Sequence, residues 1–157
     1  MTPGCIRTVQ STWVKVLAVK DTAAPLFYER LFETDPSLRV LFRSDIRQQG
    51  EKLMQVIDAA VNGLSRLDRI VSAIQELGRR HADYGVKDHH YDTVGVVLLW
   101  TLGESLGAEF TPEAKDAWAT AYGVLATTMR EAAVTTGGAN TSAAGTKPAS
   151  AQPSSAD

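Results

Sequence analysis

The sequence predicts a single all-α domain of six to seven packed helices. Apolar residues recur at helical spacing from Ile6 to Met129, and no stretch of useful length alternates as a strand would. The 157 residues fit one domain, and 44 % of them are hydrophobic, which is enough to form a sizeable core. Short links between long segments with apolar stripes are typical of packed helical folds.

Two helices are expected in the first 35 residues. The first covers residues near 5–18, where apolar side chains repeat along one stripe. The second opens near Asp21 or Thr22, either of which can cap it, with Pro25 in its first turn. Asp35 ends this helix, because the residue before a proline avoids the helical region. A short turn over residues 37–42 follows.

Three more helices with apolar stripes are expected between residues 44 and 107. The first follows a cap at Ser44 or Asp45, and the second covers residues 67–84. The third begins at Asp88, which can cap it, and is closed by Gly107. The pattern therefore predicts a nearly continuous run of helices through the middle of the chain.

A last helix is predicted from Thr111, because a capping residue is followed by Pro112 and then by an acidic residue. Its apolar stripe runs from Trp118 to Met129. After Ala133 the composition changes to Ala, Ser, Thr, Gly and Pro, which cannot bury enough surface to offset the entropy of ordering. We therefore predict a folded domain over residues 1–133 and a disordered tail over residues 134–157.

Composition excludes several classes of partner. The formal charge is −2, and no basic cluster of the kind that binds nucleic acid or an anionic membrane stands out. No stretch approaches the roughly 20 apolar residues of a membrane span, and no signal peptide opens the chain. The single cysteine, Cys5, cannot form an internal disulfide or a thiolate metal cluster. A cytoplasmic protein is expected, either a monomer or a homodimer.

Polar side chains interrupt the apolar stripes at a few inward-facing positions. His81 follows Leu77 by one helical turn, and Gln49 precedes Leu53 by one turn, so each shares the apolar face of its helix. Tyr28 is a third inward candidate, with its hydroxyl as a polar group. A buried polar side chain needs a partner. A lone histidine on an apolar face is, however, more often a satisfied core residue than a metal ligand.

A haem site would explain these three residues together. Haem needs one neutral imidazole on a rigid helix, a dry cavity and an open position on the opposite face of the iron. Hydrogen-bond donors on that face stabilise bound O₂. His81 can supply the imidazole, and Gln49 and Tyr28 can supply the donors. They lie on three different predicted helices, and their spacing alone does not show that they converge.

Other sites have weaker signals. His89 and His90 are adjacent, so they are expected to face different sides of a helix, to be solvated and to form a poor metal pair. No zinc motif, glycine-rich phosphate loop or nucleophile elbow is present. Arg79 and Arg80 mark a solvated face, and one of them could meet a haem propionate, as could Lys52.

Five blocks of sequence, in order and at matching separations, resemble bacterial single-domain haemoglobins, which are relatives of the haem domain of flavohaemoglobins. The blocks are LFYERLFETDPSLRVLF, QQGEKLMQV, LGRRHADYGV, HHYDTVG and AWATAYGVLA. The resemblance covers about residues 5–133. It implies the globin fold around a pocket for haem b.

The resemblance also implies roles for individual residues. His81 corresponds to the proximal iron ligand, and the carbonyl of Leu77 is placed to accept its ring N–H. Tyr28 and Gln49 match the distal tyrosine and glutamine, with Leu53 as the apolar residue beside the ligand. The remaining matches are Pro36 at the start of a short helix, Phe42 on the porphyrin face, Val86 and Tyr91 on the proximal side, and Arg80 as the candidate propionate contact.

The sequence departs from the family at two points. The catalytic members pair the proximal histidine and tyrosine with a glutamate on the last helix, and the matching residue here is Ala133. Glu131 is two residues away, about 200° around the helix. The chain is also expected to lack a reductase domain, because it leaves no room for flavin or nicotinamide sites.

The expected function is reversible binding of O₂, and also of CO and NO, to a five-coordinate ferrous haem, as in oxygen transport. One alternative is a nitric oxide dioxygenase, in which bound O₂ and NO yield nitrate and a separate reductase restores the iron. A second is a haem-based gas sensor, although the tail is too short and polar for an output domain. A third is a globin-like module without haem, which would leave His81 and Phe42 without a purpose.

Overall fold

The protein is all-α, as predicted. The computed structural model describes residues 1–42 and 44–140, with side chains described as far as residue 134. Within these ranges six α-helices and three short 3₁₀ helices form, and no strand does. The elements are α1 (Pro3–Leu17), α2 (Lys20–Thr34), η1 (Pro36–Leu41), α3 (Ile46–Gly63), η2 (Leu64–Arg66), α4 (Leu67–Asp83), α5 (Asp88–Leu106), η3 (Gly107–Glu109) and α6 (Pro112–Asn140).

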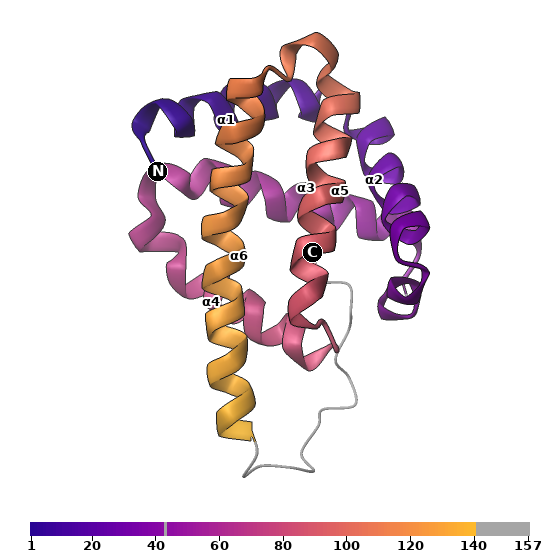
Figure 1. The fold of residues 1–157 in the computed structure, drawn as a ribbon, viewed down its shortest axis with the longest axis vertical. Helices are drawn as coiled ribbons and strands as arrows, with labels where there is room; N and C mark the ends of the chain where they lie inside the picture. The colour runs from indigo at the N-terminus through magenta and orange to yellow at the C-terminus, as the bar shows by residue number, and fades with distance from the viewer. Residues whose placement is uncertain (43, 141–157) are drawn as a thin grey trace.

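The helices cross one another rather than forming a parallel bundle. Figure 1 shows α5 and α6 running upright, with α1 and α3 crossing behind them. The most extensive packing is between α4 and α6, and α2 packs mainly against α5 and α3. Helix pairs that cross at large angles leave room between them for a cavity, and this arrangement positions the site described below.

The helix starts agree with the sequence patterns at some positions and differ at others. The side chain of Thr111 accepts a hydrogen bond from the Ala114 N–H at 3.1 Å, as its capping role predicts. Helix α2 begins earlier than expected, at Lys20, so Pro25 lies inside it and neither Asp21 nor Thr22 is the cap. Backbone bonds from Thr22 and Ala23 to the Val19 carbonyl start this helix without a side-chain cap.

Two further predicted caps differ in detail. Asp45 occupies the N-cap position of α3, but its side chain makes no capping hydrogen bond. Asp88 is the first residue of α5 rather than its cap, and Lys87 holds the cap position. The Lys87 N–H donates to Nδ1 of His90 at 2.9 Å, so a histidine three residues along performs the reciprocal half of a capping box.

The last helix runs beyond the predicted end of the folded domain. Helix α6 is assigned over Pro112–Asn140. The boundary of the folded domain after residue 133 stays a prediction. No proline removes a backbone donor between Val134 and Asn140, although Gly137 and Gly138 disfavour helix. The rest of the predicted tail, residues 141–157, lies outside the described residues.

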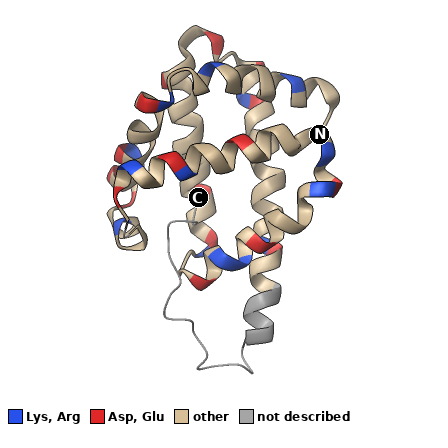
Figure 2. Ribbon diagram, turned by 180° about the vertical axis from the view of Figure 1, so that it is seen from behind, with Lys and Arg blue, Asp and Glu red and all other residues tan. Residues whose placement is uncertain are grey.

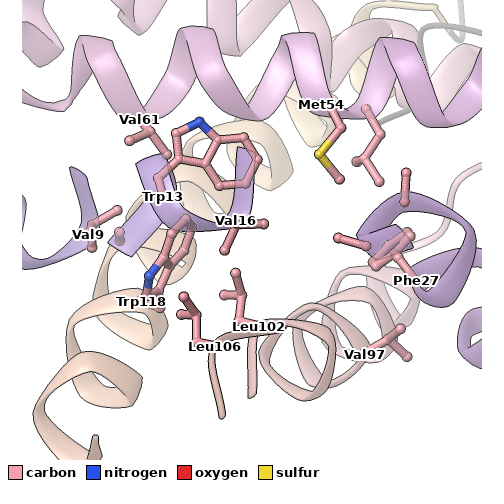
Figure 3. Packing of buried hydrophobic residues seen from close by; sticks show 14 of the residues in the cluster. Val9, Trp13, Val16, Phe27, Met54, Val61, Val97, Leu102, Leu106 and Trp118 are labelled. Carbon is pink, nitrogen blue, oxygen red and sulfur yellow. The ribbon is translucent and has the colours of Figure 1, made fainter. Parts of the chain in front are cut away.

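The main core joins α1 to the other long helices. Trp13 and Trp118 are neighbours in this core (Figure 3). Their ring centroids are 6.0 Å apart. Each indole N–H has an acceptor: Asp58 Oδ1 at 2.9 Å for Trp13, and Thr12 Oγ1 at 2.9 Å for Trp118. Both large aromatic side chains are thereby buried without an unpaired donor.

Charged side chains are interspersed on the surface. Figure 2 shows Lys and Arg alternating with Asp and Glu along the helices, without a large region of one sign. Among the described residues, no helix has both the length and the apolar character needed to cross a membrane.

A glycine permits the close approach of α4 and α6. A Cβ atom added at Gly78 would lie 2.4 Å from the backbone oxygen of Met129, closer than atoms can pack. Gly78 stands between Leu77 and Arg79, one turn before His81, so this contact also fixes the position of the C-terminal half of α4.

We therefore expect Gly78→Ala to lower the free energy of unfolding by about 1–3 kcal/mol, because α4 must move away from α6. Urea denaturation measures this change. The matched control is Gly123→Ala on α6, where a Cβ meets nothing within 4 Å and the helix should be stabilised slightly. Equal stability of the two variants would contradict the proposed close contact.

Candidate functional site

An apolar cavity lies between the main core and a second apolar cluster. The second cluster consists of Ile74, Leu77, Tyr91, Ala126 and Met129. The volume of the cavity is about 140 Å³, counted as the space open to the centre of a water molecule, and its wall is almost entirely apolar. Its wall includes most of the residues singled out in the sequence, namely Phe42, Leu53, Leu77, His81, Val86 and Tyr91. The structure thus brings together side chains from η1, α3, α4 and α5.

His81 is the main polar group in the cavity wall. It is only 5 % exposed, and its Nδ1 lies 2.8 Å from the carbonyl oxygen of Leu77. A carbonyl only accepts, so Nδ1 carries the proton and the Nε2 lone pair stays available. Burial lowers the pKa of His81 to about 4, and the charge of Arg80 acts in the same direction. The imidazole is therefore neutral at physiological pH.

Tyr91 backs the His81 ring. The two rings are stacked, with centroids 6.4 Å apart and planes 23° from parallel. The Tyr91 hydroxyl is buried and has no hydrogen-bond partner among the described residues, and burial raises its pKa to about 12. The hydroxyl of Tyr122 donates to the Tyr91 carbonyl at 2.6 Å, which holds the backbone of α5 against α6.

A cation, which the sequence patterns did not indicate, lies over Tyr91. The Arg130 guanidinium carbon is 5.3 Å from the centre of the Tyr91 ring. The same guanidinium pairs with Asp88 at 3.2 Å and with Asp92 at 2.6 Å. Arg130 lies one turn before Val134 on the last helix, on the side that faces α5. This position was the only signal that could have suggested the contact with Tyr91.

Tyr28 and Gln49 lie next to each other but are not part of the cavity wall. The Tyr28 hydroxyl donates to the backbone carbonyl of Gln49 at 3.3 Å. Their neighbours along the helices, Phe27 and Leu53, do line the cavity. The Tyr28 ring packs edge-on against Phe42, with centroids 5.4 Å apart.

The side chain of Gln49 is the most unusual polar group near the cavity. It is fully buried, and neither Nε2 nor Oε1 has a hydrogen-bond partner among the described residues. An unpaired buried amide costs free energy, so this side chain requires a partner such as an ordered water or a bound ligand.

The other predicted residues take less central positions. Arg80 and Lys52 are exposed and do not line the cavity. Arg79 lies 3.6 Å from Glu76 in an exposed ion pair. Glu131 is exposed and Ala133 is half-buried.

The expectation for the adjacent histidines was wrong. His90 is buried, 7 % exposed, and forms part of the cavity wall, whereas His89 is exposed. Their rings do not point to different sides, because the centroids are 4.3 Å apart. His90 turns back to cap α5, and the spacing from Lys87 was the signal that could have revealed it.

The comparison with protein families decides how this fold is classified. Residues 26–129 match the family model described as Globin. The chain belongs to the globin family. The all-α architecture and the cavity wall with His81 agree with the resemblance seen in the sequence.

Individual relatives of this globin agree with the family assignment. It is 31 % identical over 124 residues to flavohemoproteins of Bacillus subtilis and of Rhodopirellula baltica. The match covers 77 % of this chain but only 31 % and 30 % of those proteins, so the globin spans about a third of their length.

A solved structure confirms the fold of this globin. It is an engineered carbene transferase made from a protein assigned as a nitric oxide dioxygenase of Rhodothermus marinus. The TM-score is 0.81 at 23 % identity, covering 90 % of this chain and 99 % of that one.

The buried neutral His81 predicts a pH dependence of stability for the globin free of any bound cofactor. The unfolded chain takes up a proton on this ring below about pH 6.5, whereas the folded chain does so only near pH 4. The free energy of unfolding should therefore fall by up to about 3 kcal/mol as the pH drops through this window.

Urea denaturation between pH 7 and pH 4 measures the effect, with His81→Leu as the comparison because its side chain does not titrate. As the pH is lowered, the free energy of unfolding should fall more steeply for the wild type than for His81→Leu. Parallel curves would show that His81 does not titrate as its burial requires.

Proposed function

We propose that this globin binds haem, with His81 as the proximal iron ligand. The observation that carries the proposal is the orientation of this one ring. Nδ1 is engaged by the Leu77 carbonyl at 2.8 Å, and the ring forms part of the cavity wall. A neutral imidazole with a free Nε2, held by a hydrogen bond at its other nitrogen, is the usual form of a histidine ligand.

The remainder of the cavity fits a porphyrin. The wall is almost entirely apolar, as a large flat hydrophobic group requires. Phe42, which follows η1, and Val86, in the link after α4, line the cavity, and the resemblance assigns both to porphyrin contacts. We expect haem b and assign Arg80, exposed on α4, as the propionate contact because its guanidinium can pair with a carboxylate at the mouth.

The distal side of the site is formed by Tyr28, Gln49 and Leu53. The side-chain amide of Gln49 is an unpaired hydrogen-bond donor. The Tyr28 hydroxyl donates to the backbone carbonyl of Gln49. Leu53, one turn from Gln49 on α3, lines the cavity, so these donors lie beside its wall. Donors here would stabilise a gas ligand that carries partial negative charge.

Ferrous haem, when bound, supplies an iron atom that binds O₂, CO and NO reversibly. The chain contributes the axial imidazole, the apolar surroundings and two donors for the ligand. We therefore propose a gas-binding globin for oxygen storage or transport. A cytoplasmic location and a monomeric or homodimeric state remain predictions.

Nitric oxide dioxygenation with a separate reductase is the second candidate. The relatives favour it, since two are named flavohemoproteins and one structure derives from a protein assigned as a nitric oxide dioxygenase. The proximal side argues against it, because Tyr91 faces the Arg130 cation and the residue at the family's glutamate position is Ala133. NO consumption during steady reduction by an added reductase separates this activity from simple binding.

The first test is the absorption spectrum of the purified protein. We expect one haem per chain, a five-coordinate ferrous form without ligand and a shift of the main band on addition of CO. A chain that neither carries haem nor takes it up on titration would contradict the proposal.

Tyr28→Phe should speed the release of O₂, because one hydrogen bond to the gas is lost and most changes in affinity arise in the dissociation rate. A tenfold increase corresponds to about 1.4 kcal/mol. Stopped-flow displacement of O₂ by CO measures it. Tyr84→Phe is the matched control, since it removes the same hydroxyl from a residue outside the cavity wall. Equal release rates for wild type and Tyr28→Phe would refute the distal role.

A further inference from the structure

A second cluster of ligand-type side chains lies where α2 meets α5. Asp35 ends α2, and His89 and His90 are the second and third residues of α5. One ligand atom from each of the three lies within 4.8 Å of the others. We propose that Asp35, His89 and His90 bind a divalent transition metal ion such as Zn²⁺. The site uses none of the residues assigned to haem.

The carboxylate of Asp35 is held in place and charged. Its Oδ1 accepts hydrogen bonds from the Ser37 N–H at 3.1 Å and the Ser37 hydroxyl at 2.6 Å. These bonds, together with the two nearby imidazoles, keep the pKa of Asp35 below its ordinary value. Its second oxygen, Oδ2, has no hydrogen-bond partner among the described residues and is left for a metal.

The two imidazoles are close together. The ring centroids are 4.3 Å apart with planes tilted by 53°, so both rings face the same region of space. Burial lowers the pKa of His90, with a further contribution from His89. His90 is therefore neutral at physiological pH, and the neutral ring is the form that binds metals.

Two features limit the affinity. The Lys87 N–H already donates to Nδ1 of His90 at 2.9 Å, so metal binding must replace this hydrogen bond. The N-terminal end of α5 and the Lys87 ammonium also oppose a cation, and Asp35 has to offset them. The Asp88 carboxylate offsets less of this positive charge, because it already pairs with Arg130 at 3.2 Å. We therefore expect weaker binding than at a structural zinc site with four protein ligands.

The donor set selects the class of metal. Two imidazole nitrogens and one carboxylate oxygen suit Zn²⁺ and Cu²⁺, whereas Mg²⁺ and Ca²⁺ prefer oxygen ligands alone. Three protein ligands leave the fourth position for water, which the exposure of His89 permits. Because His90 also lines the large cavity, a metal here would tie the end of α2 to the cavity wall.

The experiment is a calorimetric titration of the untagged full chain with Zn²⁺ at pH 7.5, followed by thermal unfolding with and without the metal. We expect one saturable site, a higher melting temperature with Zn²⁺ and weaker binding at pH 5.5, where protons compete for the imidazoles. Mg²⁺ should give no signal. No saturable binding of Zn²⁺ by the wild-type chain would overturn the proposal.

Variants locate the metal. His89→Ala should lower Zn²⁺ affinity at least about tenfold, since loss of a ligand should cost no less than loss of an outer-shell partner. Asp35→Asn should also weaken binding. Cys5→Ser is the matched control, because it removes the chain's one thiol without touching the cluster, and its affinity should equal the wild type's. Wild-type affinity in His89→Ala, or loss of binding in Cys5→Ser, would overturn the assignment.

Discussion

The hydrogen bond between His81 Nδ1 and the carbonyl oxygen of Leu77 determines what the cavity can bind. It joins two positions one turn apart on α4, so the helix itself supplies the acceptor and fixes the ring. A buried histidine must satisfy one nitrogen to be tolerated, and here that requirement leaves the other nitrogen free. The same bond therefore stabilises the ring and sets its orientation.

The rest of the fold holds α4 in the position that this bond requires. Gly78 lets α4 approach the backbone of α6 at Met129, and Tyr122 on α6 donates to the backbone of α5 at Tyr91. Tyr91 in turn stacks on His81. Three helices thus converge on one imidazole through close packing, a backbone hydrogen bond and a ring contact. The Arg130 guanidinium lies over the Tyr91 ring, 5.3 Å from its centre.

Local sequence patterns were sufficient to predict the helices and the inward position of His81, because helical periodicity indicates which side chains face the core. The cap at Thr111 and the inward face of Gln49 also follow from short-range rules. These short-range rules did not predict the contacts between segments that are distant in the sequence. The approach of Asp35 to His89 and the position of Arg130 over Tyr91 depend on how α2 and α6 cross α5. His90 was misjudged because its side chain caps its own helix instead of pointing outward.

The most direct test of the central claim is haem binding by His81→Gly, with and without imidazole in solution. The glycine removes the ring while leaving the cavity open to an imidazole molecule that can replace it. We expect the variant to lose the five-coordinate ferrous spectrum of the wild type and to regain it when imidazole is added. A variant that takes up haem and shows the wild-type spectrum without imidazole would contradict the assignment of His81 as the iron ligand.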